Sequence, residues 1–98
     1  MRAIREFAID ADHPALPGHF PGDPLVPGSL VLDAVIAGQP LLRRQPVHIE
    51  SVRFLAPLRP AQKVAVEYRG STPDRLSFVC RVDGTPICKG RITLAGRS

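Results

Sequence analysis

Two side chains in the first third of the chain, His19 and Asp33, are of the types that perform general acid–base chemistry. His19 lies in the segment Pro14–Gly28, whose fifteen residues include five prolines and three glycines. Each proline fixes its own φ and restricts the residue before it, so the segment predicts a rigid loop rather than a helix or a central strand. The sequence therefore places a histidine on a rigid loop, with a carboxylate a short way along the chain.

The run SLVLDAVIAG, residues 29–38, predicts a helix that begins near Gly28 and is apolar on almost every side. Such a helix is typically buried, and Ser29 is a candidate cap at its start. A buried carboxylate is costly unless it is paired or reaches solvent, which makes Asp33 a candidate functional residue. The helix start adds unpaired N–H groups. A lone loop histidine is often only a turn residue, and a lone helical aspartate is often solvated, but their combination predicts a catalytic site.

The run GHFPGDPLVPG, residues 18–28, followed by Asp33, closely resembles the active-site signature of the β-hydroxyacyl-acyl-carrier-protein dehydratases of bacterial fatty-acid synthesis. The run IESVRFLAPLRP, residues 49–60, resembles the strand that follows the helix in this family. With the terminal strands, the resemblance covers nearly the whole chain. It implies an α+β hotdog fold over residues 1–98, a single domain in which one curved antiparallel sheet of about five strands wraps around a central hydrophobic helix.

The same resemblance implies dehydration of 3-hydroxyacyl chains on acyl-carrier protein to trans-2-enoyl thioesters. His19 would remove the α-proton, the Gly28 N–H would stabilise charge on the thioester oxygen, and Asp33 would assist the departing hydroxyl. The other residues expected to bind the substrate or line an acyl tunnel are Leu16, Phe20, Val26, Pro27 and Val31. The apolar ones among them fit the hydrophobic core at least as well.

In this family the histidine of one subunit works with the acid of another, so the resemblance implies a homodimer or a higher oligomer of dimers. It also implies acyl-carrier protein as a partner, with no cofactor and no metal. The sequence has neither a Gly-rich phosphate loop nor a His/Cys cluster with metal-ligand spacing. The formal net charge of +4 agrees in sign with an acidic carrier, whereas scattered arginines and only five aromatic residues argue against nucleic acid.

Three features depart from the family pattern. The acid is Asp33 rather than a glutamate, Ala61-Gln62 stands where a Gly-Asp pair is usual, and the chain is short. Aspartate resembles the branch that also isomerises the double bond, and the short chain resembles small dehydratase-like subunits of polyketide and aryl-polyene pathways. The acyl chain length, the pathway and any isomerase activity therefore stay open.

The chain has no apolar run near the ~18 residues that span a bilayer, and its first ten residues lack a signal-peptide core, so a cytoplasmic location without membrane insertion is expected.

Hydrophobic alternation predicts five strands, with a bulge in the second and a turn at 70–74. The expected strand ranges are 3–10, 47–55, 63–69, 76–82 and 87–95. Cys80 and Cys88 fall in the last two strands and are expected as free thiols that could face each other across a hairpin.

Two other functions fit parts of this pattern. The same fold could hydrolyse thioesters or act as a coenzyme-A hydratase, but the GHFPG run argues against this function. Alternatively, the chain could be a non-catalytic acyl-binding subunit that completes a heterodimer, although the presence of both His19 and Asp33 argues against lost activity. Whatever the function, one sheet combined with a helix that is apolar on every side predicts that part of the helix is left for a partner subunit.

Overall fold

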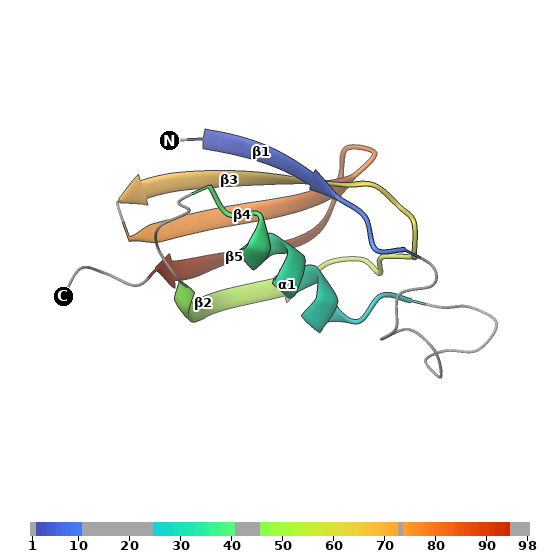
Figure 1. Ribbon diagram of the computed structural model, residues 1–98, viewed down its shortest axis with the longest axis horizontal. Coiled ribbons are helices and arrows are strands. Elements are labelled where there is room, and N and C mark those ends of the chain that lie inside the picture. Colours follow the sequence, from blue (N-terminus) through green and yellow to red (C-terminus); the bar gives the residue numbers. More distant parts are fainter. Residues whose placement is uncertain (1, 11–24, 41–45, 73, 95–98) are drawn as a thin grey trace.

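The computed structural model describes residues 2–10, 25–40, 46–72 and 74–94 of the 98-residue chain. These residues form a strand, a helix and four further strands, in the order that the sequence predicts (Figure 1). The elements are β1 Arg2–Phe7, α1 Gly28–Ala37, β2 Pro46–Phe54, β3 Val64–Thr72, β4 Arg75–Val82 and β5 Thr85–Leu94.

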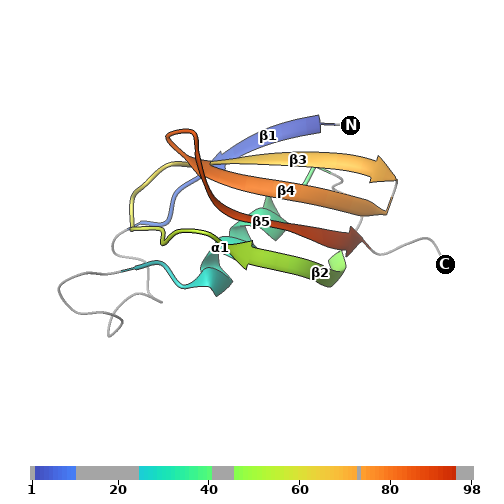
Figure 2. The same cartoon turned by 180° about the vertical axis from the view of Figure 1, so that it is seen from behind.

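The five strands form one antiparallel sheet in the order β1-β3-β4-β5-β2, so that β1 and β2 are its edges. α1 lies across one face of this sheet, which we term the inner face. The view from behind shows the outer face, on which the described residues place no helix (Figure 2). The expected α+β arrangement, an antiparallel sheet with one helix against it, is confirmed.

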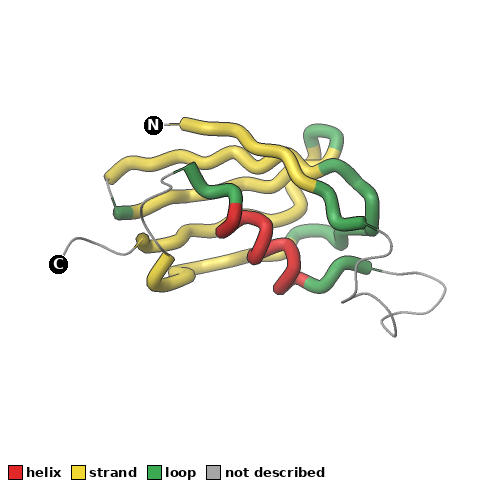
Figure 3. The backbone as a smooth tube through the Cα atoms, viewed as in Figure 1, coloured by secondary structure: helices red, strands yellow, loops and turns green. Residues whose placement is uncertain are grey.

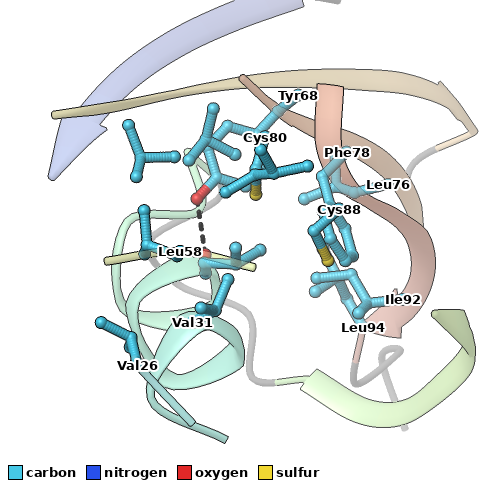
Figure 4. Close-up of a cluster of buried hydrophobic side chains, with 14 residues drawn as sticks. Val26, Val31, Leu58, Tyr68, Leu76, Phe78, Cys80, Cys88, Ile92 and Leu94 are labelled. Carbon is cyan, nitrogen blue, oxygen red and sulfur yellow. Dashed lines mark hydrogen bonds between the residues drawn. The ribbon is translucent and has the colours of Figure 1, made fainter. Parts of the chain in front are cut away.

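The core lies between α1 and the inner face, where the tube view shows the helix crossing the sheet (Figure 3). It follows from the alternation of the strand sequences, because successive side chains of a strand point to opposite faces. The buried apolar side chains from the three central strands are Val64, Val66, Tyr68, Leu76, Phe78, Cys80, Ile87, Cys88, Ile92 and Leu94 (Figure 4).

Cys80 and Cys88 are direct neighbours in the register of β4 and β5, and both thiols are free and fully buried. A side-chain hydrogen bond with Cys88, together with burial, raises the pKa of the Cys80 thiol. The prediction of free thiols facing each other across a hairpin is confirmed.

α1 begins directly after Pro27, whose φ of −59° and ψ of 144° are not helical. Ser29 is the second residue of the helix, and no side chain of the described residues caps this end, so the expected capping by Ser29 is wrong. Only Val31 and Val35 are buried. The Tyr68 hydroxyl donates a hydrogen bond of 2.5 Å to the Val35 carbonyl oxygen (Figure 4), and burial raises the pKa of Tyr68 to about 12. Packing and one buried hydrogen bond therefore fix α1 to β3.

The helix is not buried on all sides, because Ser29, Asp33 and Ala37 are exposed. Their spacing of four residues puts them on one stripe, opposite the side that packs on the sheet. A single helix laid across one sheet face can bury only one of its own sides. The expectation that Asp33 is buried is therefore wrong for the single chain.

None of the helices among the described residues is long and apolar enough to cross a membrane.

The strand boundaries differ from the predicted ones by three residues at two places and by at most two residues elsewhere. β1 ends at Phe7 rather than near Asp10, and β3 continues to Thr72 through much of the predicted 70–74 turn. β2 shifts register between Pro46 and His48 and again between Ile49 and Ser51, which confirms the predicted bulge.

Ala61 has a φ of +68°, in the left-handed region that favours glycine. It lies in the loop between β2 and β3, where its N–H donates a hydrogen bond of 2.7 Å to the Ile9 carbonyl oxygen. The position is the one at which the family pattern has glycine. A residue with a side chain pays roughly 1–2 kcal/mol for this conformation.

Glu67 lies on the outer face and receives three guanidinium groups. Its carboxylate oxygens are 2.6 Å from Nε of Arg2, 2.9 Å from Nη2 of Arg69 and 3.0 Å from Nη1 of Arg81. These hydrogen bonds, those of Arg69 first and Arg81 next, lower the pKa of Glu67 to about 2. One carboxylate thus ties β1, β3 and β4 together on the face that the helix does not cover.

We expect Ala61→Gly to stabilise the fold, because glycine removes the cost of the left-handed conformation and loses only part of that gain to chain entropy. The expected net gain is about 0.5–1 kcal/mol in the free energy of unfolding, measured by urea denaturation. Ala65→Gly, the second residue of β3 and paired with strands on both sides, is the matched control and should destabilise by a similar amount. Equal destabilisation by both changes would contradict the inference that the left-handed conformation of Ala61 costs stability.

The lowered pKa of Glu67 predicts acid sensitivity. Because the folded carboxyl has the lower pKa, its contribution is fully present above the unfolded value and is lost as pH falls from about 5 to about 2. Glu67→Gln should therefore flatten this part of the pH dependence of the urea midpoint. Glu6→Gln is the control, since Glu6 is on the same face and forms no ion pair within the described residues. If both variants keep the wild-type dependence of the urea midpoint on pH, the ion pairs of Glu67 do not cause the acid sensitivity.

Candidate active site

An apolar cleft of about 490 Å³ opens between the start of α1 and the end of β2. Two segments that approach each other form its walls: residues 26–31 at the helix start and residues 54–58 at and beyond the end of β2. Its principal apolar lining residues are Val26, Val31, Phe54, Leu55, Leu58 and Ile87.

Backbone hydrogen bonds hold these walls in place. The Val26 N–H donates to the Leu58 carbonyl oxygen at 2.8 Å, which joins the residues before the helix to the loop after β2. The Leu55 N–H donates to the Ile87 carbonyl oxygen at 2.8 Å, which joins the same loop to β5. The cleft is therefore built on the sheet and the helix rather than on a free loop.

Gly28 and Phe54 meet at the start of the helix. A Cβ added to Gly28 would lie 2.7 Å from Cζ of Phe54, so the ring tip rests against the glycine backbone. Gly28 is the first residue of α1, and its N–H has no acceptor among the described residues. An apolar chain lying in the cleft could thus present a carbonyl oxygen to an unpaired amide at the positive end of the helix.

Val26 and Val31 line the cleft and also belong to the core, with exposed fractions of 8% and 3%. The expectation that these residues belong to the core is therefore confirmed, whereas their binding of an acyl chain stays a prediction. Pro27 occupies the N-cap position, directly before the first residue of α1, and does not line the cleft.

Asp33 is not among the residues that line the cleft. It stands on the exposed stripe of α1, one and a half turns beyond Gly28 and turned away from the sheet. His19, Phe20 and Leu16 lie outside the described residues, so the predicted pairing of His19 with Asp33 stays a prediction. Of the predicted site residues, the structure brings Val26, Gly28 and Val31 together in one cleft.

Seven of the residues that line the cleft were not predicted as site residues: Phe54, Leu55, Ala56, Pro57, Leu58, Ile87 and Cys88. Phe54 was within reach of the sequence, since it lies in the 49–60 segment that carries the family resemblance. By alternation Cys88 is at an inward position of the predicted strand and its neighbour Ile87 at an outward one, so the pattern predicts neither the burial of Ile87 nor a place for Cys88 in a cleft rather than in the core. Only the approach of β5 to the loop after β2 assigns them to the cleft.

Comparison with known proteins shows which family has this sequence pattern and fold. The model of the ApeI-like family, described as ApeI dehydratase, matches residues 1–91. The 3-hydroxyacyl-[acyl-carrier-protein] dehydratase FabZ of Klebsiella pneumoniae subsp. pneumoniae is 28% identical, with 97% of this chain and 72% of that protein covered. FabZ of Salmonella arizonae is similar to the same extent.

Two solved structures have the same fold. In the dehydratase heterocomplex ApeI:P from Xenorhabdus doucetiae, one chain is 26% identical with a TM-score of 0.82, over 97% of this chain and 88% of that one. A protein from Erwinia carotovora subsp. atroseptica is 25% identical with a TM-score of 0.77, over 96% of this chain and 82% of that one. The expected hotdog fold is confirmed.

The two glycines Gly28 and Gly90 should respond differently to alanine. At Gly28 the new Cβ meets the tip of Phe54, whose side chain is free to swing because Phe54 is 48% exposed. At Gly90 it meets the Ser51 backbone carbonyl and the buried Phe78 ring, neither of which can move. Gly28→Ala should therefore change the free energy of unfolding by less than about 1 kcal/mol, and Gly90→Ala should cost more than about 2 kcal/mol. Losses of equal size in urea denaturation would mean that Phe54 is held rigidly.

Proposed function

The chain belongs to the ApeI-like dehydratase family, and from this membership we propose that it removes water from 3-hydroxyacyl chains on acyl-carrier protein. The products would be trans-2-enoyl thioesters. The FabZ relatives are named for this substrate class, which supports the carrier-bound form of the substrate. The observation that carries the proposal is the apolar cleft with the unpaired Gly28 amide at its mouth.

The reaction needs three groups, and each has a candidate in this chain. His19 would take the α-proton of the thioester as the general base. Negative charge would then build up on the thioester oxygen, where the Gly28 N–H donates a hydrogen bond without having to reorganise. Asp33 would hold the 3-hydroxyl group by a hydrogen bond, and as the C–O bond breaks the proton taken by His19 would be returned to that oxygen, so that it leaves as water. The acyl chain beyond these atoms would lie against Val31 and its neighbours in the cleft.

The exposed position of Asp33 is consistent with a site shared between subunits. β2 is an edge strand, and four large apolar residues on it or directly after it are exposed: Ile49, Val52, Phe54 and Leu55. An apolar edge of this kind is an interaction surface, since unpaired strand edges recruit a further strand. We infer a homodimer in which β2 pairs with its copy and Asp33 faces His19 of the other subunit.

A heterodimer is the second candidate, and one observation favours it. The structurally similar ApeI of Xenorhabdus doucetiae is described as part of a dehydratase heterocomplex. The same β2 edge would then take a related but different chain. In that arrangement the partner would supply the histidine or the carboxylate that completes each site.

Mixing two inactive variants tests the proposal. His19→Ala and Asp33→Asn should each lower kcat at least about 100-fold, because each removes one acid–base group. Neither should lower the urea midpoint appreciably, since Asp33 is exposed and unpaired within the described residues. If subunits share the site, an equimolar mixture of the two should recover about a quarter of wild-type activity, because half of the dimers regain one intact site.

Enoyl thioester formation from a 3-hydroxyacyl carrier substrate is the measurement. Recovery on mixing is absent if both groups act within one subunit. A wild-type chain that is inert alone but gains activity with a companion subunit would favour the heterodimer. Retained kcat in His19→Ala would contradict the role of the histidine as base.

A further inference from the structure

The positive charge of the chain is concentrated on the outer face of the sheet. This face carries seven of the 13 basic residues and three of the nine acidic ones, and the remaining six of each sign balance. The outer face therefore accounts for the whole formal net charge of +4. Figure 2 shows that this face is open, with the helix on the far side.

The half of the face formed by β1 and β3 is largely neutralised. Glu67 accepts hydrogen bonds from Arg2, Arg69 and Arg81, and its side chain is only 10% exposed beneath them. These cations are used to hold three strands together, so they do not require an external partner.

The half formed by β5 and β2 keeps its positive charge. Arg53 and Lys89 are directly opposite each other in the register of these strands, and neither has a carboxylate partner among the described residues. Like charges directly opposite on a sheet destabilise it, so this pair lowers the stability of the isolated chain. Arg91 lies on the next outward position of β5, and its nearest acid, Glu50, is already engaged with Thr93 and Arg75.

These three cations border a shallow groove of about 520 Å³. Its floor includes the small side chains Ser51 and Ser77, so the long cationic side chains stand above it. We term Arg53, Lys89 and Arg91 the outer strip. An uncompensated row of cations around a shallow groove is complementary to a row of carboxylates on another protein.

We propose that the outer strip is the docking surface for an acidic protein, and that its occupant is the acyl-carrier protein of the proposed function, on which this inference rests. The strip is close to the cleft along the chain: Arg53 points to the outer face, and the next residue, Phe54, lines the cleft on the inner face. A carrier held on the strip would pass its acyl thioester around the end of β2 at Leu55.

Other anionic partners fit the strip less well. Single-stranded nucleic acid is bound with aromatic side chains on which bases stack, and Phe7, Phe54, Tyr68 and Phe78 all belong to the inner side of the sheet. A membrane surface is bound by cations together with apolar side chains that insert. The outer-face neighbours of the outer strip are Ser51, Ser77 and the half-buried Val79, and the exposed Ile4 is at the opposite edge of the sheet.

The test compares two double charge reversals. Arg53→Glu with Lys89→Glu alters the strip, and Arg59→Glu with Lys63→Glu makes the same change in charge in the loop between β2 and β3. Each is assayed on one 3-hydroxyacyl group, carried either by acyl-carrier protein or by a short carrier-free thioester. Binding of the carrier is also measured by fluorescence anisotropy.

The strip variant should lower kcat/KM for the carrier-bound substrate roughly tenfold or more at low salt, and leave the carrier-free substrate unchanged. The difference should shrink as salt approaches roughly 0.5 M, because screening weakens exposed charges. The loop variant should change neither substrate by more than about twofold. Carrier affinity in the anisotropy measurement should fall in parallel with kcat/KM.

Three results would overturn the inference. The first is a loss of carrier binding in the loop variant but not in the strip variant, which would put docking at the cleft edge. The second is an equal loss on both substrates, which would make the strip structural. The third is tighter, strip-dependent binding to phosphatidylserine vesicles or an oligonucleotide than to the carrier. If the wild type turns over neither substrate, the proposed function fails, and the anisotropy measurement still decides where an acidic carrier binds.

Discussion

The attachment of one helix to one sheet face is the constraint on which the rest of this structure depends. Val31 and Val35 pack on the inner face, and the Tyr68 hydroxyl holds the Val35 carbonyl oxygen at 2.5 Å. Burying that hydroxyl without a partner would cost about 1–3 kcal/mol. The hydrogen bond therefore favours one orientation of α1 about its own axis over others that would break it. This orientation puts Gly28 at the cleft and turns Asp33 away from the sheet.

The two faces of the sheet separate two kinds of interaction. The inner side buries aromatic and aliphatic side chains against α1, whereas the outer side carries arginines, lysine and glutamates in an open layer. Where a carboxylate is available, as at Glu67, the arginines link strands. Where none is available, as at Arg53 and Lys89, like charges stay opposed at a cost to stability. Such a cost is understandable if another molecule supplies the missing negative charge.

Much of the fold could be predicted from the sequence, because alternation in β3, β4 and β5 reports directly which side chains are inward. The strand ends were less predictable: Gly70, in a typical turn sequence, stays within β3, because β3 and β4 pair again at Thr72 and Arg75 after a register shift. Burial of Asp33 was wrong because composition shows that a helix is apolar but not how many of its sides find a neighbour. The cleft was only partly foreseen, since Ile87 reaches it through the hydrogen bond to Leu55, a contact between segments distant in sequence.

The exposed edge and the cleft share a residue, which links assembly to the site. Phe54 is 48% exposed on the edge strand β2, and its ring also rests on the Gly28 backbone at the mouth of the cleft. A strand added beside β2 would therefore cover Phe54 and restrict its ring at the same time. An isolated chain leaves that ring free to move across the Gly28 amide, which has no acceptor among the described residues. On this argument a partner at the β2 edge defines the shape of the cleft as well as enclosing the exposed side of α1.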